Sequence, residues 1–215
     1  MDNFYKENFG DFMKIMKKID FDTISVVVLE EVKTYTGEEI EPFWAFKMFD
    51  IQKDSIIGFN GPMNVKIENM KDLKDIKEEQ DIKTPIMSSD ALNFIVEHFD
   101  NPDLKMIYLR QRILVSIAKD VIENYSGLKL KKSGDDLYFN EKKLSVCIAC
   151  RGVSSGKIHL GINVKSDFVP THVSAIGLND IGLSNVLEIM EDIAVEYANE
   201  MSKIERDIRK TLPLF

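Results

Sequence analysis

Short apolar runs alternate with polar stretches along the first third of the chain, as in strands joined by loops. Residues 24–29 (ISVVVL) are mostly β-branched, which predicts a buried strand. Residues 54–63 (DSIIGFNGPM) predict a strand that runs into a glycine-proline loop, and residues 64–68 predict a second strand. The charged residues 69–83 predict a solvated connection, and residues 11–18 predict a short amphipathic turn or helix.

Two helices are predicted in the middle of the chain and one at its end. Ser88 is available as an N-cap before the apolar residues 91–99, so we expect a helix there. A second helix is expected from residue 103 to about residue 125, with Gly127 as its stop. The last predicted helix, at residues 184–211, has apolar positions at helical spacing.

Between the second and third of these helices, the hydrophobic period changes from helical to alternating. Four strand-like runs, at residues 128–131, 136–139, 144–150 and 158–164, are joined by short turns, which predicts an antiparallel meander. We therefore expect an α/β (α+β) fold, in which helices pack on a mixed, largely antiparallel sheet. The length fits a single domain over residues 1–215.

Charge and hydropathy narrow the range of partners. The 215 residues include 36 acidic and 28 basic side chains, a net charge of −8, and the lysine clusters are short, so we expect no nucleic-acid partner. No stretch reaches the ~18 consecutive apolar residues of a membrane span. Residues 1–20 lack the apolar core of a signal peptide. We expect a cytoplasmic protein without a membrane partner.

Cys147 and Cys150 are the two cysteines, and their C-x-x-C spacing is found in metal and redox sites. The run that contains them is predicted to be a strand, where residues three apart point to opposite faces. The two sulfurs would then not converge on one ion. The pattern favours two structural cysteines over a metal or redox pair.

The segment 134–145 (GDDLYFNEKKLS), followed by residues 160–164 (LGINV), resembles the biotin/lipoate protein ligase superfamily. In those ligases a strand begins with Asn-Asp or Asp-Asp. A turn then leads to a lysine, which is followed by an apolar residue and a small residue. A later strand contains the pattern Gly-x-Asn. The matching lysine is Lys143. Residues 54–62, 94–99 and 110–114 further resemble an archaeal family of unknown function assigned to that superfamily.

This resemblance implies the superfamily's catalytic-domain fold and a ligase-like or acyltransferase-like activity. The implied ligand is a small carboxylated molecule of lipoate, biotin or fatty-acyl type, activated with ATP and Mg²⁺ and passed to an acceptor carrier protein. Lys143 would be the catalytic cation, because a lysine on a rigid strand can neutralise developing negative charge. Asp135 and Asp136 would be the carboxylates available to magnesium.

Residues 58–61 would provide a glycine-rich loop in which Gly58, Asn60 and Gly61 approach phosphate or the acyl group. The chain departs here from the superfamily pattern, since it has neither a Gly-Arg-Gly loop nor an Arg-Arg followed by glycines. Asn60 lies where an arginine is expected. The departure concerns the adenylation step more than the fold. A non-catalytic ligand-binding or protein-interaction module is therefore an alternative to the ligase-like activity.

On the last predicted strand, His159, Gly161 and Asn163 share a face, because strand residues two apart are co-facial. They are therefore ligand-binding candidates, and His159 is an acid-base candidate near neutral pH. Two of them also have a structural interpretation. His159 could be a hydrogen-bonded core histidine, and Asn163 could cap a loop.

The remaining candidates also have structural alternatives. Lys143 could be a surface lysine on an edge strand, and Asp135 and Asp136 could belong to a plain turn after Gly134. His98 is expected at the end of a helix. The final helix could supply the face of a homodimer.

Overall fold

The computed structural model describes residues 13–82, 85–100, 103–167 and 173–214. Its strands are β1 (Ile15–Asp20), β2 (Ile24–Leu29), β3 (Asp54–Val65), β4 (Ile86–His98), β5 (Lys131–Ser133), β6 (Asp136–Phe139), β7 (Lys142–Lys143), β8 (Ser145–Arg151) and β9 (Gly156–Asn163). Six of them form a sheet in the order β1-β2-β3-β4-β9-β8, in which only β2 and β3 are parallel neighbours. The others form a small antiparallel sheet, β5-β6-β7.

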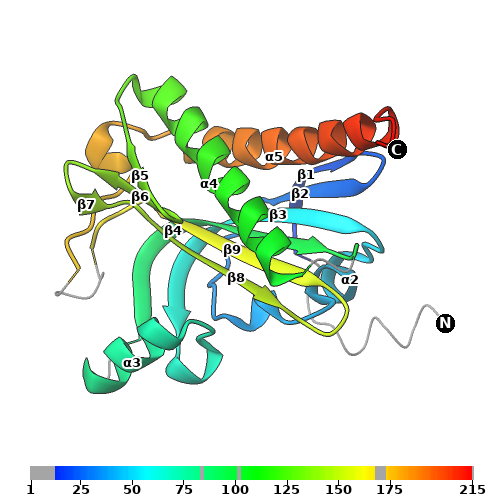
Figure 1. Ribbon diagram of the computed structural model, residues 1–215. Coiled ribbons are helices and arrows are strands. Elements are labelled where there is room, and N and C mark those ends of the chain that lie inside the picture. The colour runs from blue at the N-terminus through cyan, green and yellow to red at the C-terminus, as the bar shows by residue number, and fades with distance from the viewer. Residues whose placement is uncertain (1–12, 83–84, 101–102, 168–172, 215) are drawn as a thin grey trace.

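The helices divide between the two faces of the large sheet. They are α2 (Trp44–Phe49), α3 (Leu73–Ile82), α4 (Leu104–Ser126) and α5 (Val186–Arg209), with short 3₁₀ turns η1 (Glu38–Ile40), η2 (Ile67–Asn69) and η3 (Asn179–Ile181). Helices α4 and α5 cover one face, and α3 lies on the other side (Figure 1). The predicted α+β fold with a largely antiparallel sheet is confirmed.

Burial on both faces explains the apolar runs of the central strands. In β2, Val26 and Val28 belong to the core under α4 and α5, which we call the helical layer. Val27 and Leu29 belong to the core on the opposite face, which we call the outer layer. A strand buried on both sides has no need of polar residues at alternate positions, so it reads as a continuous apolar run.

The helix predicted over residues 91–99 was wrong, because residues 91–98 belong to strand β4. Leu92 and Phe94 pack in the helical layer, and Ala91 and Ile95 pack in the outer layer. Since both faces are apolar, the sequence shows no period of two, and a short apolar run cannot be told from a buried helix by period alone.

His98 is accordingly at the end of a strand and not at the end of a helix. Its Nδ1 lies 2.6 Å from Asp54 Oδ2, and its Nε2 lies 2.8 Å from the Tyr197 hydroxyl. These two contacts tie β4 to the start of β3 and to helix α5. The ring is 2% exposed, which makes it a structural histidine.

Several element boundaries also differ from the prediction. Residues 54–65 form one continuous strand instead of a strand, a loop and a second strand. Residues 15–18 lie in β1 and not in a helix, and residues 11–12 fall outside the described part of the chain. The charged segment 69–83 contains α3. The predicted meander is antiparallel, but its strands are shared between the two sheets.

The two long helices are confirmed. Asp103 caps α4 by accepting a hydrogen bond from the Met106 N–H at 2.8 Å, and Gly127 ends the helix with a φ of 69°. Cys147 and Cys150 pack in different layers, as predicted from their spacing on a strand. The two thiols therefore do not form a pair.

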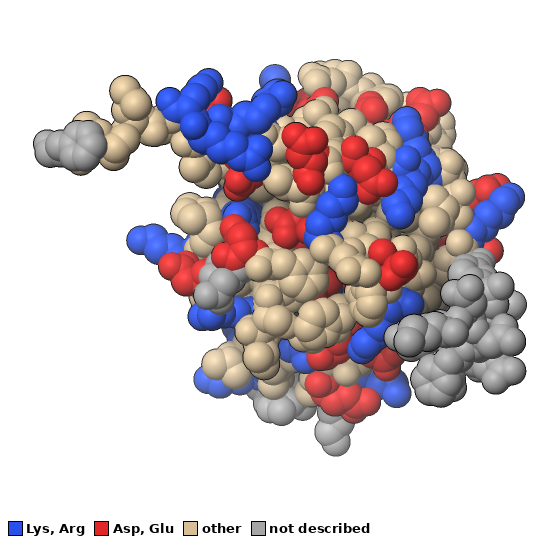
Figure 2. Space-filling view, turned by 90° about the vertical axis from the view of Figure 1, so that its right-hand side faces the viewer, with Lys and Arg blue, Asp and Glu red and all other residues tan. Residues whose placement is uncertain are grey.

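Charged side chains of both signs cover the surface seen from the side of α2 and the carboxyl end of α5 (Figure 2). Lys and Arg gather at one upper corner of that view, and acidic and basic residues are interspersed over the rest. Among the described residues, none of the helices combines the length and apolarity needed to cross a membrane.

One ion pair is buried in the outer layer. Lys157 and Glu97 meet at 2.9 Å with side chains 1% and 0% exposed. The Glu97 carboxylate also accepts hydrogen bonds from the Ser155 hydroxyl at 2.6 Å and the Phe43 N–H at 3.0 Å. Burial lowers the pKa of Lys157, and the attraction of Glu97 opposes that shift. The cluster holds Phe43 in a left-handed conformation at the start of α2.

We expect Lys157→Met to lower the free energy of unfolding by about 3–5 kcal/mol, because it leaves the buried Glu97 charge without its partner. Urea unfolding measures this loss. The double variant Lys157→Met/Glu97→Gln should recover most of it, since glutamine is neutral and keeps an oxygen for Ser155 and Phe43. Equal stabilities of wild type and Lys157→Met would show that the pair contributes nothing.

Candidate functional site

A small cavity opens in the outer layer, on the face of the large sheet opposite α4 and α5. Its volume is about 50 Å³. Apolar side chains form most of its lining: Met63, Val65, Met70, Ile86, Val146 and Ile148. Polar side chains from the end of η2 to the first turn of α3 also line it: Asn69, Lys71, Asp72 and Asp75. An apolar lining with a few polar groups is typical of small-ligand sites.

Two buried rings form one wall of this cavity. Tyr35 stacks on His159 with ring centroids 3.6 Å apart and planes inclined by 14°. His159 Nε2 lies 3.0 Å from Asn93 Oδ1 on the neighbouring strand. Burial lowers the pKa of His159 to about 3, so the ring is neutral. These contacts favour a structural role over acid-base chemistry near neutral pH, although the ring does face the cavity.

Gly161 and Asn163 follow on the same face of β9. A Cβ atom on Gly161 would lie 2.7 Å from the Met63 sulfur, so any other residue there would require the Met63 side chain to shift. Asn163 Nδ2 donates to the Ile176 carbonyl oxygen at 3.3 Å. Asn163 thus fastens the segment that follows β9, which is the loop-capping alternative considered for it.

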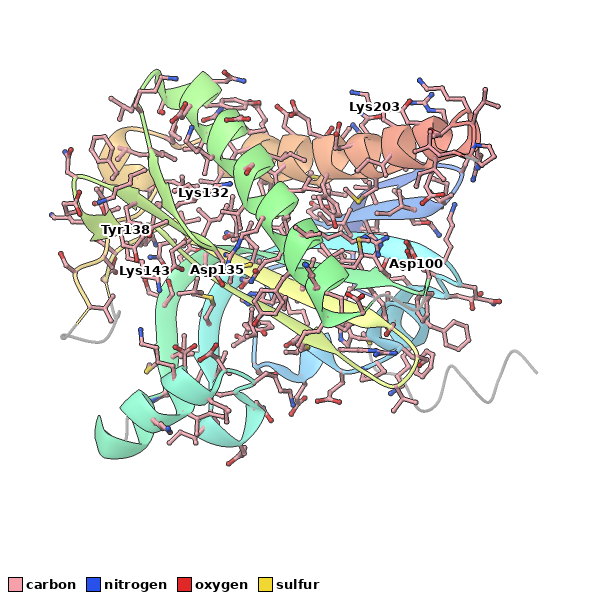
Figure 3. The ribbon with its side chains drawn as sticks, in the orientation of Figure 1. Asp100, Lys132, Asp135, Tyr138, Lys143 and Lys203 are labelled. Carbon is pink, nitrogen blue, oxygen red and sulfur yellow. The ribbon has the colours of Figure 1, made fainter. Side chains whose placement is uncertain are left out.

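Lys143 is held by both its backbone and its side chain. Its N–H donates to the Ser174 carbonyl at 2.8 Å, and its carbonyl accepts from the Ile176 N–H at 3.0 Å. Its Nζ lies 2.9 Å from Asp136 Oδ2, with 29% of the side chain exposed. Figure 3 shows Lys143 near Tyr138 and Asp135, where the small sheet meets the large one.

The Lys143 side chain remains a cation. Burial by itself would lower the pKa of Lys143, but the Asp136 carboxylate outweighs burial and the pKa lies above its ordinary value. Asp75, which lines the cavity, adds to the same upward shift. The charge of Asp75, in the lining of the cavity, therefore acts on the Lys143 ammonium.

Asp135 and Asp136 point to different partners. Asp135 lies 3.0 Å from Arg112 and accepts a hydrogen bond from Gln111 at 3.0 Å, both on α4, whereas Asp136 pairs with Lys143. In the part of the chain that the structure describes, no group of three or more His, Cys, Asp and Glu side chains could hold a metal ion. A role of these carboxylates with magnesium stays a prediction.

The glycine-rich loop expected at residues 58–61 is wrong, because these residues lie within strand β3. A Cβ on Gly58 would face Met190 of α5 at 3.0 Å, in the helical layer and away from the cavity. A Cβ on Gly61 would lie 2.3 Å from the Lys33 carbonyl oxygen. These glycines permit close packing and cradle no phosphate. Asn60 lies between them on the same strand.

Sequence reasoning missed several residues at the cavity. Tyr35 lies between the predicted strands at residues 24–29 and 54–63, where no element was predicted, and Asn93 belongs to the segment predicted as a helix. Met63 follows the Gly-Pro pair that suggested a loop. Neither hydrophobic period nor motif signals such residues, because strands and loops distant in the sequence bring them together.

The largely antiparallel sheet packed by helices is similar to the fold of a solved biotin protein ligase. The structure resembles the Aquifex aeolicus biotin protein ligase in complex with biotin and ATP, with a TM-score of 0.55. The similarity covers 86% of this chain and 73% of that one at 14% identity, so it shows a common fold and nothing more.

The chain belongs to the family described as a domain of unknown function, DUF366, which matches residues 24–212. An uncharacterised protein of Methanocaldococcus jannaschii is 62% identical over 213 residues, which are 97% of this chain and 95% of that protein. A solved protein of unknown function from Pyrococcus horikoshi has a TM-score of 0.82 and 34% identity, covering 90% of this chain and 100% of that one. The predicted resemblance is confirmed for the family and the fold.

We expect His159 to make stability fall as the pH is lowered from 6.5 toward about 3. In this window the unfolded histidine binds a proton and the buried ring does not, so protonation favours unfolding, by on the order of several kcal/mol at the low end. His159→Gln removes this titration. The free energy of unfolding in urea should then depend less steeply on pH in the variant than in wild type, and parallel pH profiles would contradict the assignment.

Proposed function

We propose that this protein binds a small carboxylated ligand with an apolar body, of lipoate, biotin or fatty-acyl type, and ligates or transfers its acyl group. The observation that carries the proposal is the apolar cavity together with the fixed cation of Lys143, on which Asp75 of the cavity lining acts. The apolar body would lie in the cavity. The ligand carboxylate would take the place of Asp136 at the Lys143 ammonium.

The proposed chemistry follows from that placement. Acyl transfer develops negative charge on the acyl oxygen, and a cation held in advance stabilises this charge without reorganisation. Lys143 meets the requirement because its backbone is fastened on both sides to residues 174–176. Tyr35 and His159 would pack against the apolar body as a rigid, neutral wall.

Activation by ATP is the finer part of the proposal. The Aquifex aeolicus protein of the same fold binds biotin and ATP, which supports a test of both ligands. Magnesium would enter with the nucleotide, because Asp135 and Asp136 are already paired with Arg112 and Lys143. A lysine of a carrier protein would accept the acyl group.

The second candidate is a binding module without adenylation. It is favoured by the packing of Gly58 and Gly61, which leaves no phosphate loop in β3, and by the absence of an arginine there. The two candidates differ in one product. A ligase releases pyrophosphate from ATP in the presence of the acid, and a binding module does not.

We expect a saturating acid to raise the midpoint of thermal unfolding. At ~100 times its dissociation constant a ligand adds about 2.7 kcal/mol, roughly 5–10 °C for a chain of this length. The series is biotin, lipoate and medium-chain fatty acids, each with and without Mg-ATP. Lys143→Ala should abolish the shift, and Lys142→Ala, at an exposed neighbour on the same strand, should keep it. An undiminished shift in Lys143→Ala would refute the role of this lysine.

A further inference from the structure

The cavity is smaller than the ligands proposed for it. Its volume of about 50 Å³ is well below the ~300–1,000 Å³ of typical small-ligand sites. Binding of an acyl chain therefore requires one wall to move. The walls differ in how readily they can do so.

The wall formed by the stacked rings is fixed. Tyr35 is held by backbone bonds to β3, with its N–H on the Pro62 carbonyl and its carbonyl on the Asn64 N–H, both at 2.9 Å. His159 is stacked beneath it and bonded to Asn93. Moving either ring would break several of these contacts.

Met63 is the wall that can move. Its side chain is 2% exposed, and its sulfur fills the space above Gly161 that a side chain would otherwise occupy. Methionine is unbranched with three rotatable bonds, so it changes shape at lower cost than the branched and aromatic side chains around it. Rotation of Met63 would extend the cavity over Gly161.

The space above Gly161 leads toward Lys143. On β9, Gly161 lies between His159, which lines the cavity, and Asn163. Each of these residues is about 6.6 Å from Gly161 along the strand. The Asn163 N–H donates to the Leu144 carbonyl, directly after Lys143, at 2.9 Å. The strip above Gly161 and Asn163 thus begins at the lining of the cavity and ends at the backbone beside Lys143.

This strip is narrow. The position of a Cβ on Gly161 is 3.3 Å from both His159 and Val146, which bound it on two sides. Both distances are shorter than ordinary van der Waals contact, so a slender methylene chain needs a small shift of these side chains, whereas a bicyclic ring system needs a large one. The geometry therefore favours a linear acyl chain.

We infer that Met63 sets the depth of the cavity and that the ligand is a linear carboxylic acid selected by its chain length. The inference rests on the proposed function. The carboxylate binds Lys143, the chain runs over Asn163 and Gly161, and its end displaces the Met63 thioether. Met63→Ala removes three heavy atoms from this path and admits a longer chain.

The test measures dissociation constants of linear carboxylic acids of increasing length for wild type, Met63→Ala and Met63→Leu. Each buried methylene should tighten binding about fourfold until the cavity is full. We expect the preferred length to grow by about three carbons in Met63→Ala and to stay unchanged in the volume-conserving Met63→Leu. Met63→Val, which removes less volume, should give a smaller extension and serves if Met63→Ala does not fold.

A second substitution tests the strip itself. Gly161→Ala in the Met63→Ala background places a methyl group on the path and should shorten the preferred length again. In the wild-type background the same methyl group would collide with the Met63 sulfur, so Gly161→Ala alone should be less stable than the double variant.

Linear alcohols of the same lengths separate this inference from the proposed function, because they lack the carboxylate. If wild type and Met63→Ala prefer the same chain length, both among the acids and among the alcohols, the role of Met63 is overturned and the proposed function stands. If the preferred length of the alcohols is greater in Met63→Ala than in wild type but no acid binds, the proposed function is overturned and the role of Met63 is kept. Preference for biotin over every linear acid would overturn the linear chain, and absence of binding in both series would overturn both.

Discussion

The constraint on which the structure depends is the burial of both faces of the large sheet. Helices α4 and α5 cover one face, so the central strands are apolar on that side, and the cavity lies on the other. The outer layer is built from short pieces, η1, α2, η2 and α3, which do not close over the sheet as two long helices do. The cavity lies among these pieces.

The same constraint governs where polar residues occur in the outer layer. Glu97 and Lys157 are tolerated because each satisfies the other, with Ser155 and Phe43 completing the carboxylate's hydrogen bonds. Asn93 satisfies His159 in the same manner. Lys143 differs from this pattern because it and its carboxylate partner Asp136 are partly exposed, so separating this pair costs less than separating a fully buried one.

The sequence allowed good predictions where one local signal dominates. β2 was predicted from β-branching, and α4 and α5 from helical spacing, with a stop glycine for α4. The shared face of His159, Gly161 and Asn163 followed from strand alternation. β4 was assigned as a helix because burial on both faces removes the alternation that distinguishes a strand. Gly58 and Gly61 suggested a loop because the sequence does not show that Met190 and Lys33 approach them closely.

The candidate site was predictable in part, and for a related reason. The motif located Lys143 and Asp136, which lie near each other along the chain. The cavity could not be predicted, because Tyr35, Met63 and His159 come from three separate segments and meet only through the pairing of the strands. A site assembled across a sheet leaves no spacing in the sequence by which to recognise it.

The division of the sheet into two layers has an evolutionary consequence. The helical layer holds the larger share of the buried apolar residues, and the side chains around the cavity belong to the smaller outer layer. Substitutions that reshape the cavity therefore affect the smaller of the two cores, which contributes the smaller part of the free energy of unfolding. A chain built in this way can diverge in ligand preference among its descendants while the helical layer keeps the fold intact.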